Sequence, residues 1–217
     1  MPIRQIKIAV SLVLMLAAVA LLASRYYFST PNIEAQPHAG IGEALAERVT
    51  QLGGKGRVVL MVPDTSEGKF PGAAIQLQAF HAALRRANLT VTLTNVVKID
   101  PNRVLRAPPG DFTDLLRKFT DADVVVSLLG PPVLNGDQKA RVGEKHPKII
   151  AVCTGDLPKQ VNLKTIFAEQ FLHAAIISRP GVGLTTPTSE KPADWFQYYF
   201  LWITPQNLAD LPEGGVK

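Results

Sequence analysis

Cysteine and histidine are scarce in this chain. Of its 217 residues, one is a cysteine, Cys153, and four are histidines. A single cysteine excludes an internal disulfide framework and every zinc or redox motif that needs two cysteines. No two histidines stand four residues apart, as a helical zinc site would require. We therefore expect no metal site and no cofactor.

Acidic side chains are missing from the first 28 residues, and polar ones are few. Residues 8–28 form a nearly continuous apolar run in which Arg25 is the one charge. About 20 apolar residues in a helix span the hydrocarbon core of a bilayer. Arg4 and Lys7 precede the run, which predicts a cytoplasmic N-terminus, and the aromatic residues 26–28 suit a membrane interface.

Two interpretations of this segment place the rest of the chain outside the cytoplasm. In the first, residues 8–28 are a single-pass anchor in a bacterial inner membrane, with the following domain in the periplasm. In the second, residues 8–17 are the apolar region of a signal peptide that is cleaved after Ala18-Val19-Ala20, which releases the domain. The apolar run continues past Ala20, so we favour the anchor. A buried core helix is the third alternative.

The excess of positive charge lies mostly in that segment. The chain has 23 Lys and Arg residues, and Arg4, Lys7 and Arg25 precede residue 29, which leaves 20 basic against 18 acidic residues. A net charge of +2 over residues 29–217 does not indicate a nucleic-acid partner. The pair Arg85-Arg86 is explained by the end of a predicted helix, where cations interact favourably with the helix dipole.

Residues 29–42 are rich in proline and glycine and predict a linker, followed by an exported domain over residues 43–217. Within that domain, apolar stripes at helical spacing alternate with short β-branched runs. The predicted helices are 43–52, 72–87, 111–119, 138–145 and 163–171, and the predicted strands are 57–62, 89–97, 123–129, 148–153, 174–178 and 196–204.

This alternation predicts an α/β domain of the three-layer type. Strands that alternate with helices form right-handed crossover units and a mostly parallel sheet. The strands are continuous apolar runs, as expected where helices cover both faces. The fold class is thus an open, Rossmann-like or flavodoxin-like sheet, preceded by one N-terminal transmembrane helix.

Polar residues follow several predicted strands. Asp64, Thr65 and Ser66 come after the first strand, and Asp156 follows the fourth. In open α/β sheets, ligands bind outside the carboxyl ends of the strands, so these side chains predict a polar binding site. The alternative is that they are ordinary turn and cap residues.

No catalytic motif is present. The sequence has no GxSxG, GxxxxGK[ST] or GxGxxG pattern in the required context. Ser178, His173 and Asp156 are the residue types of a hydrolytic triad, but nothing in their spacing selects them, and His173 is explained as a cation at a helix end. Cys153 ends an apolar strand and is expected to be an inert buried thiol.

Four segments resemble type 1 periplasmic sugar-binding proteins and their repressor relatives. The similarity extends over roughly residues 56–210, about one lobe, and has the order of the family's C-terminal lobe. The segments are Phe200–Asp210 (FLWITPQNLAD), like the closing strand and turn; Ala174–Gly183 (AAIISRPGVG), like the late strand and Pro-Gly loop; Gly72–Leu84, like the first long helix; and Asp121–Gly130, like the third strand.

The resemblance also implies where a ligand would bind, and this chain departs from the family there. Gln76 stands near the position of the arginine that commonly holds the sugar, and Ser178 replaces a glutamine. Gly130-Pro131 replaces an Asn-Asp pair, whereas Asp156 matches a retained aspartate. Loss of charge-assisted hydrogen bonds argues against the usual sugar ligand. A single lobe also lacks the two-lobe closure of a full receptor.

Three functions are therefore compared. The first is a membrane-anchored, extracytoplasmic binding module that engages a partner protein or small polar ligand through its strand-end loops. The second is a non-catalytic structural subunit of a cell-envelope membrane complex, in which Tyr199 and Trp202 on an aromatic edge strand dock a partner. The third, an exported hydrolase, lacks an identifiable nucleophile and base. We favour the first and expect no enzymatic activity.

Overall fold

The computed structural model describes residues 14–20, 34–53, 56–100, 106–183 and 186–211. The chain divides into two compact units, Met1–Ile33 and Glu34–Lys217. In the first unit, residues 14–20 are helical. Within the described ranges, no helix combines the length and apolar character needed to cross a bilayer. Most of the predicted anchor, residues 8–28, lies outside those ranges.

The second unit is built on a six-stranded sheet with the order β2-β1-β3-β4-β5-β6. The first five strands are parallel, and β6 runs antiparallel to β5. The strands are β1 (Val58–Pro63), β2 (Val91–Val97), β3 (Val124–Ser127), β4 (Lys148–Cys153), β5 (Ala174–Ser178) and β6 (Phe200–Ile203). The predicted open, mostly parallel sheet is confirmed.

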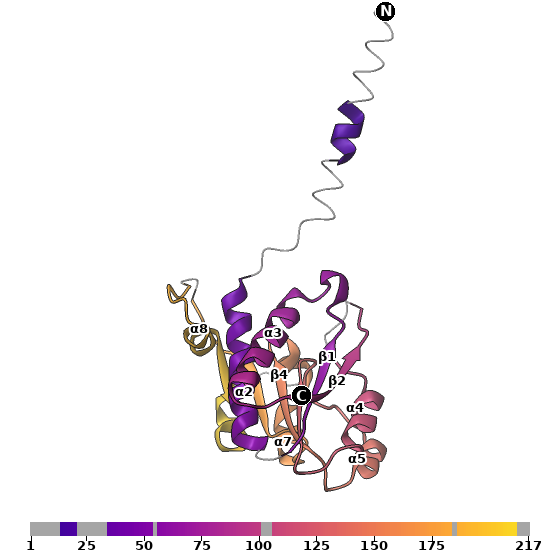
Figure 1. Cartoon of the computed structure of the whole chain (residues 1–217). Helices are drawn as coiled ribbons and strands as arrows, with labels where there is room; N and C mark the ends of the chain where they lie inside the picture. Colours follow the sequence, from indigo (N-terminus) through magenta and orange to yellow (C-terminus); the bar gives the residue numbers. More distant parts are fainter. Residues whose placement is uncertain (1–13, 21–33, 54–55, 101–105, 184–185, 212–217) are drawn as a thin grey trace, which may run out of the picture. The chain divides into compact units, whose positions relative to one another are not determined.

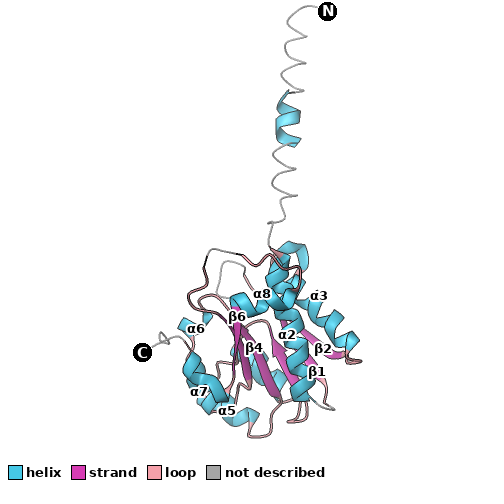
Figure 2. Cartoon of the chain, turned by 90° about the vertical axis from the view of Figure 1, so that its left-hand side faces the viewer, coloured by secondary structure: helices cyan, strands magenta, loops and turns pink. Residues whose placement is uncertain are grey.

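Helices cover both faces of this sheet, which gives the predicted three layers (Figures 1 and 2). Alternate residues of β1 enter opposite cores, with Val59 and Met61 in one and Leu60 and Val62 in the other. The first core is closed by α4 (Pro109–Leu116), α5 (Gly136–Val142), α6 (Leu157–Gln160) and α7 (Leu163–Ala168). The second is closed by α2 (Ala35–Gly53), α3 (Pro71–Arg86) and α8 (Pro192–Tyr199).

The linker prediction for residues 29–42 is wrong from Ala35 onward, because α2 begins there. Gly40 and Gly42 do not break this helix. A Cβ on Gly42 would lie 2.3 Å from the carbonyl oxygen of Gln76 in α3, and one on Gly40 would lie 2.4 Å from the carbonyl oxygen of Pro192 in α8. These glycines let three helices approach closely.

The predicted final strand, residues 196–204, is also wrong in its first half. Residues 192–199 form α8, and the strand starts at Phe200. Pro192 occupies the first helical turn, where its missing N–H is not needed. Trp195 and Tyr199, four residues apart, stack with ring centroids 5.9 Å apart. Their aromatic character suggested a strand, but their spacing is helical.

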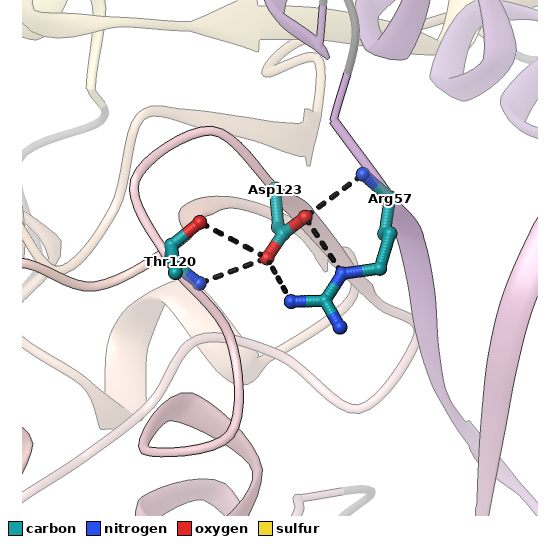
Figure 3. A network of polar contacts seen from close by, with 3 residues as sticks. All are labelled: Arg57, Thr120 and Asp123. Carbon is teal, nitrogen blue, oxygen red and sulfur yellow. Dashed lines mark hydrogen bonds and ion pairs between the residues drawn. The ribbon is translucent and has the colours of Figure 1, made fainter.

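A buried carboxylate joins β1 and β3 at their amino ends (Figure 3). Asp123 accepts hydrogen bonds from the backbone N–H (2.9 Å), Nε (3.1 Å) and Nη2 (2.8 Å) of Arg57. It also accepts from the N–H (2.8 Å) and hydroxyl (3.3 Å) of Thr120. The Arg57 guanidinium holds the pKa of Asp123 well below its usual value, so the carboxylate is ionised and fully engaged. This network lies at the opposite end of the sheet from the predicted binding loops.

Candidate functional site

The strand order creates a switch point between β1 and β3. From β1 the chain moves outward to β2 through α3, whereas β3, β4 and β5 follow on the other side. The connections therefore leave the carboxyl ends of β1 and β3 in opposite directions, which is where open α/β sheets form a crevice. The predicted polar residues Asp64 and Asp156 follow β1 and β4, on either side of the β3 loop.

The loop after β1 holds its aspartate in a defined position. The Asp64 N–H donates to the carbonyl of Val97 at 3.0 Å, which ties the loop to β2. One carboxylate oxygen of Asp64 accepts from the Ser66 N–H at 3.0 Å, at the start of the short 3-10 helix η1 (Ser66–Gly68). Hydrogen bonds from Ser66 lower the pKa of Asp64. Asp64 is thus an ionised acceptor at the edge of the loop, with Thr65 beside it.

The loop after β4 contains the second predicted aspartate. Asp156 is exposed and forms an ion pair with Lys159 at 2.9 Å, which lowers the pKa of Asp156. Sequence reasoning did not single out Lys159, although a basic residue three positions after an aspartate is a usual helical pair. Gly155 precedes the pair with φ +67°, and its N–H donates to the Ser178 hydroxyl at 3.2 Å. Ser178 therefore supports the loop from β5.

The loop after β3 packs between these two. Residues 128–132 are buried, and Gly130 has φ +77°. A Cβ there would lie 2.5 Å from Cδ2 of Leu157 in α6, so the β3 and β4 loops are in direct contact. Neighbouring strands are about 4.8 Å apart, which places the ends of β1 and β4 about 10 Å apart. The loops that carry the two aspartates therefore lie on either side of the buried β3 loop.

Gln76 does not belong to these loops. It is buried in α3, and its side-chain Nε2 lies 3.3 Å from Nδ1 of His38 in α2. Burial lowers the pKa of His38, so its neutral ring accepts the amide hydrogen. The resemblance predicted a ligand contact for Gln76, and the structure places this side chain between two helices instead.

The residues of the hypothetical triad do not meet. His173 precedes β5 and Ser178 ends it, so they lie at opposite ends of one strand. The predicted role of His173 as a cation is also wrong. Its Nδ1 accepts from the Ile149 N–H at 3.2 Å, and burial lowers its pKa to about 4. Cys153 is fully buried and burial raises its pKa, as expected for an inert thiol.

No metal centre occurs among the described residues, because no three His, Cys, Asp or Glu side chains there converge. The two residues predicted to dock a partner lie on different elements. Tyr199 is the last residue of α8, and Trp202 lies on β6 with the Arg48 guanidinium 5.1 Å from its ring centre. Beside Trp202 is a groove of about 430 Å³ between α2 and α8.

Comparison with protein-family profiles gives no match, and comparison with curated protein sequences gives none either. Solved structures do resemble the chain. An ABC-transporter solute-binding protein from Burkholderia graminis, in complex with D-arabinose, matches with a TM-score of 0.50 and 12% identity, over 79% of this chain and 61% of that one. A sugar-binding protein of a sugar ABC transporter from Bacillus halodurans matches with a TM-score of 0.50 and 14% identity, over 81% and 64%.

At this level of identity the likeness shows the fold. The chain spans about three fifths of the length of these sugar-binding proteins. It has the three-layer architecture of one of their lobes, as the sequence motifs predicted.

Proposed function

We propose that this chain is an extracytoplasmic binding module, tethered to the membrane by residues 8–28, that holds a small polar ligand at the carboxyl ends of β1 and β4. The observation that carries the proposal is the pair of ionised aspartates, Asp64 and Asp156, on either side of the buried β3 loop. The fold supports the proposal, because ligands of open α/β sheets bind outside the carboxyl ends of the strands, and a solute-binding protein of similar fold is described in complex with D-arabinose.

The chemistry of the two side chains restricts the ligand. An ionised carboxylate accepts hydrogen bonds and does not donate them. A matching ligand therefore presents separate hydroxyl or amine donors to the two carboxylates. A polyhydroxylated molecule or a polyamine satisfies this description.

The location follows from the N-terminal segment. Its basic start and apolar run favour an anchor with the domain on the far side of the inner membrane. A protease added to spheroplasts would digest the domain if it lies in the periplasm, and a domain that is degraded only after lysis contradicts the proposal. An intact mass of the mature chain that lacks the first 20 residues would show instead that the segment is a cleaved signal.

Ligand binding is tested by thermal shift of the purified chain against panels of sugars, polyols and polyamines. For a molecule that raises Tm, we expect Asp64→Ala and Asp156→Ala each to reduce the shift, with the unliganded Tm nearly unchanged because both carboxylates lie in surface loops. Asp121→Ala is the matched control, since Asp121 is exposed near the amino end of β3. If both variants keep the full shift, the ligand binds elsewhere.

A further inference from the structure

The two edges of the sheet differ in how they are protected. At the β6 edge, the carbonyl oxygens of Phe200 and Trp202 accept hydrogen bonds from Arg179 Nη2 (3.3 Å) and Asn207 Nδ2 (2.8 Å). Asn207 Oδ1 also accepts from the N–H of Thr204, just after the strand, at 2.7 Å. Side chains of the chain itself thus occupy groups with which a further strand would pair.

The β2 edge has a different character. Residues 89–97, LTVTLTNVV, contain no charged residue, no proline and no glycine. Thr92 and Thr94 are exposed, and Leu93 and Val96 are 41% and 54% exposed. Edge strands normally carry a charge, a proline or a covering element that prevents pairing with another chain. An exposed, uncharged and β-branched edge instead favours such pairing.

The backbone of β2 presents its free groups at alternate residues. The carbonyl of Val97 accepts from the Asp64 N–H, so it points toward β1. Successive residues of a strand direct their backbone groups to opposite sides. The N–H and C=O groups of Thr94 and Val96 therefore point away from β1, toward the open edge.

We propose that β2 pairs with β2 of a second copy of this chain, antiparallel and across a two-fold axis, so that the two sheets become one. A two-fold axis at Leu93 or Thr94 places uncharged residues opposite one another at every position of the strand, and an axis at Asn95 brings Thr92 opposite Lys98 without opposing like charges. Cross-strand pairs of β-branched residues stabilise a sheet, and no like charges oppose each other.

The protected β6 edge explains why such an assembly would stop at two copies. A pair formed through β2 uses both open edges, and the outer edges of the joined sheet are then two copies of β6. Their outward carbonyls already accept hydrogen bonds from Arg179 and Asn207. The arrangement is therefore a closed dimer with one isologous interface, the commonest form of oligomer, rather than a growing fibre.

The first test is the mass of the full chain, purified in detergent and measured by light scattering with the detergent contribution subtracted. We expect the wild-type chain to have twice its monomer mass of 23.5 kDa. Thr94→Lys places like charges next to each other in the interface and is expected to halve the mass. The control is Ala140→Lys, which adds the same charge at an exposed position of α5 and is expected to remain dimeric.

The second test uses cysteine pairs and does not depend on disrupting the dimer. Cys153 is buried, so single variants Leu93→Cys, Thr94→Cys and Asn95→Cys each add one accessible thiol. Because a two-fold axis brings the residue on it against its own copy, one of these variants is expected to form a disulfide-linked dimer under mild oxidation. Ala140→Cys is the control and is expected to remain unlinked.

Three results would overturn the proposal. One is a wild-type chain that is monomeric. A chain that binds a different protein through β2 and not a second copy of itself would count as the same result. Another is a dimer that Thr94→Lys leaves intact, which would place the interface elsewhere, for example in residues 1–33. The third is equal crosslinking of the β2 variants and Ala140→Cys.

Discussion

Asp123 joins two strands through five hydrogen bonds that it accepts from Arg57 and Thr120. Its side chain is 4% exposed, whereas that of Arg57 is 49% exposed. Removing the carboxylate leaves the N–H groups of Arg57 and Thr120 without their acceptor, while the guanidinium can still reach water. We expect Asp123→Ala to lower the free energy of unfolding by about 2–4 kcal/mol, measured by urea denaturation.

Asp121→Ala is the control for this prediction, because Asp121 is exposed and lies two residues away. Its effect is expected to stay within about 0.5 kcal/mol. Equal denaturation midpoints for the two variants would contradict the structural role of Asp123.

We expect the titration of His173 to lower the free energy of unfolding in mild acid. Burial lowers its pKa from 6.5 to about 4, so the unfolded chain takes up this proton first as the pH falls. Its contribution to stability is complete above pH 6.5 and is lost as the pH falls toward 4. We expect a loss of about 2 kcal/mol over this window, less than the full shift implies because the ring is partly exposed.

His173→Asn separates this titration from the others. The Asn Oδ1 can still accept from the Ile149 N–H, as Nδ1 does now, but it does not titrate. Urea unfolding at pH 7 and pH 4.5 should therefore show a smaller loss for the variant than for the wild type. Parallel losses in the two proteins would mean that other groups cause the acid sensitivity.

Single residues were predictable where the chain direction alone decided their place. Asp64 and Asp156 follow parallel strands, so they had to lie at the same end of the sheet. Gln76 was misplaced because its helix has two sides, and only the position of α2 shows that this amide faces His38. His173 looked like a helix-end cation because its acceptor role toward Ile149 depends on a contact between strands distant in sequence.

At the scale of elements, α2 depends on Gly42, although a glycine at this place in the sequence suggests the end of a helix. The Cα of Gly42 faces the backbone of α3, and an added Cβ would lie 2.3 Å from the Gln76 carbonyl oxygen. Backbone cannot move aside as a side chain can, so Gly42→Ala must separate the helices. We expect a loss of about 2 kcal/mol, or a Tm lower by about 4–8 °C.

Gly110→Ala is the matched control for Gly42→Ala. Gly110 also lies in a helix, α4, and an added Cβ would meet nothing within 4 Å. Because alanine favours the helix and restricts the unfolded chain, this variant should keep or slightly raise Tm. If both variants behave alike, α2 and α3 are not in the close contact described.

Helices and strands were predictable where their sequence pattern indicated a single type of secondary structure. The buried strands β4 and β5 have the predicted bounds, because runs such as KIIAVC and AAIIS have the length and continuous apolar character of a central parallel strand. The start of α2 was missed because proline and glycine suggest a linker. There Pro37 occupies the first turn of the helix and Gly40 and Gly42 lie at helix contacts. The role of the two glycines depends on tertiary packing, which local patterns do not contain.

At the scale of the whole molecule, the three layers were predictable from the sequence, but the residue at which the folded unit begins was not. Alternating strands and helices imply a parallel sheet covered on both faces, and the right-handed crossover rule leaves few topologies. The sequence did not show that the closing strand β6 reverses direction, because that depends on how α8 turns the chain. Nor did it show that the unit begins at Glu34 rather than residue 43.

This boundary leads to a prediction about truncation. Residues 34–217 form a compact unit, so a chain that starts at Glu34 should fold and unfold with a Tm close to that of the full chain. A chain that starts at Glu43 loses Ile41, which is 1% exposed, and the contact between His38 and Gln76. Burial of Ile41 contributes about 2–3 kcal/mol, so we expect a Tm lower by about 10 °C. Equal Tm values for the two truncated chains, measured by circular dichroism, would show that the first turns of α2 do not stabilise the domain.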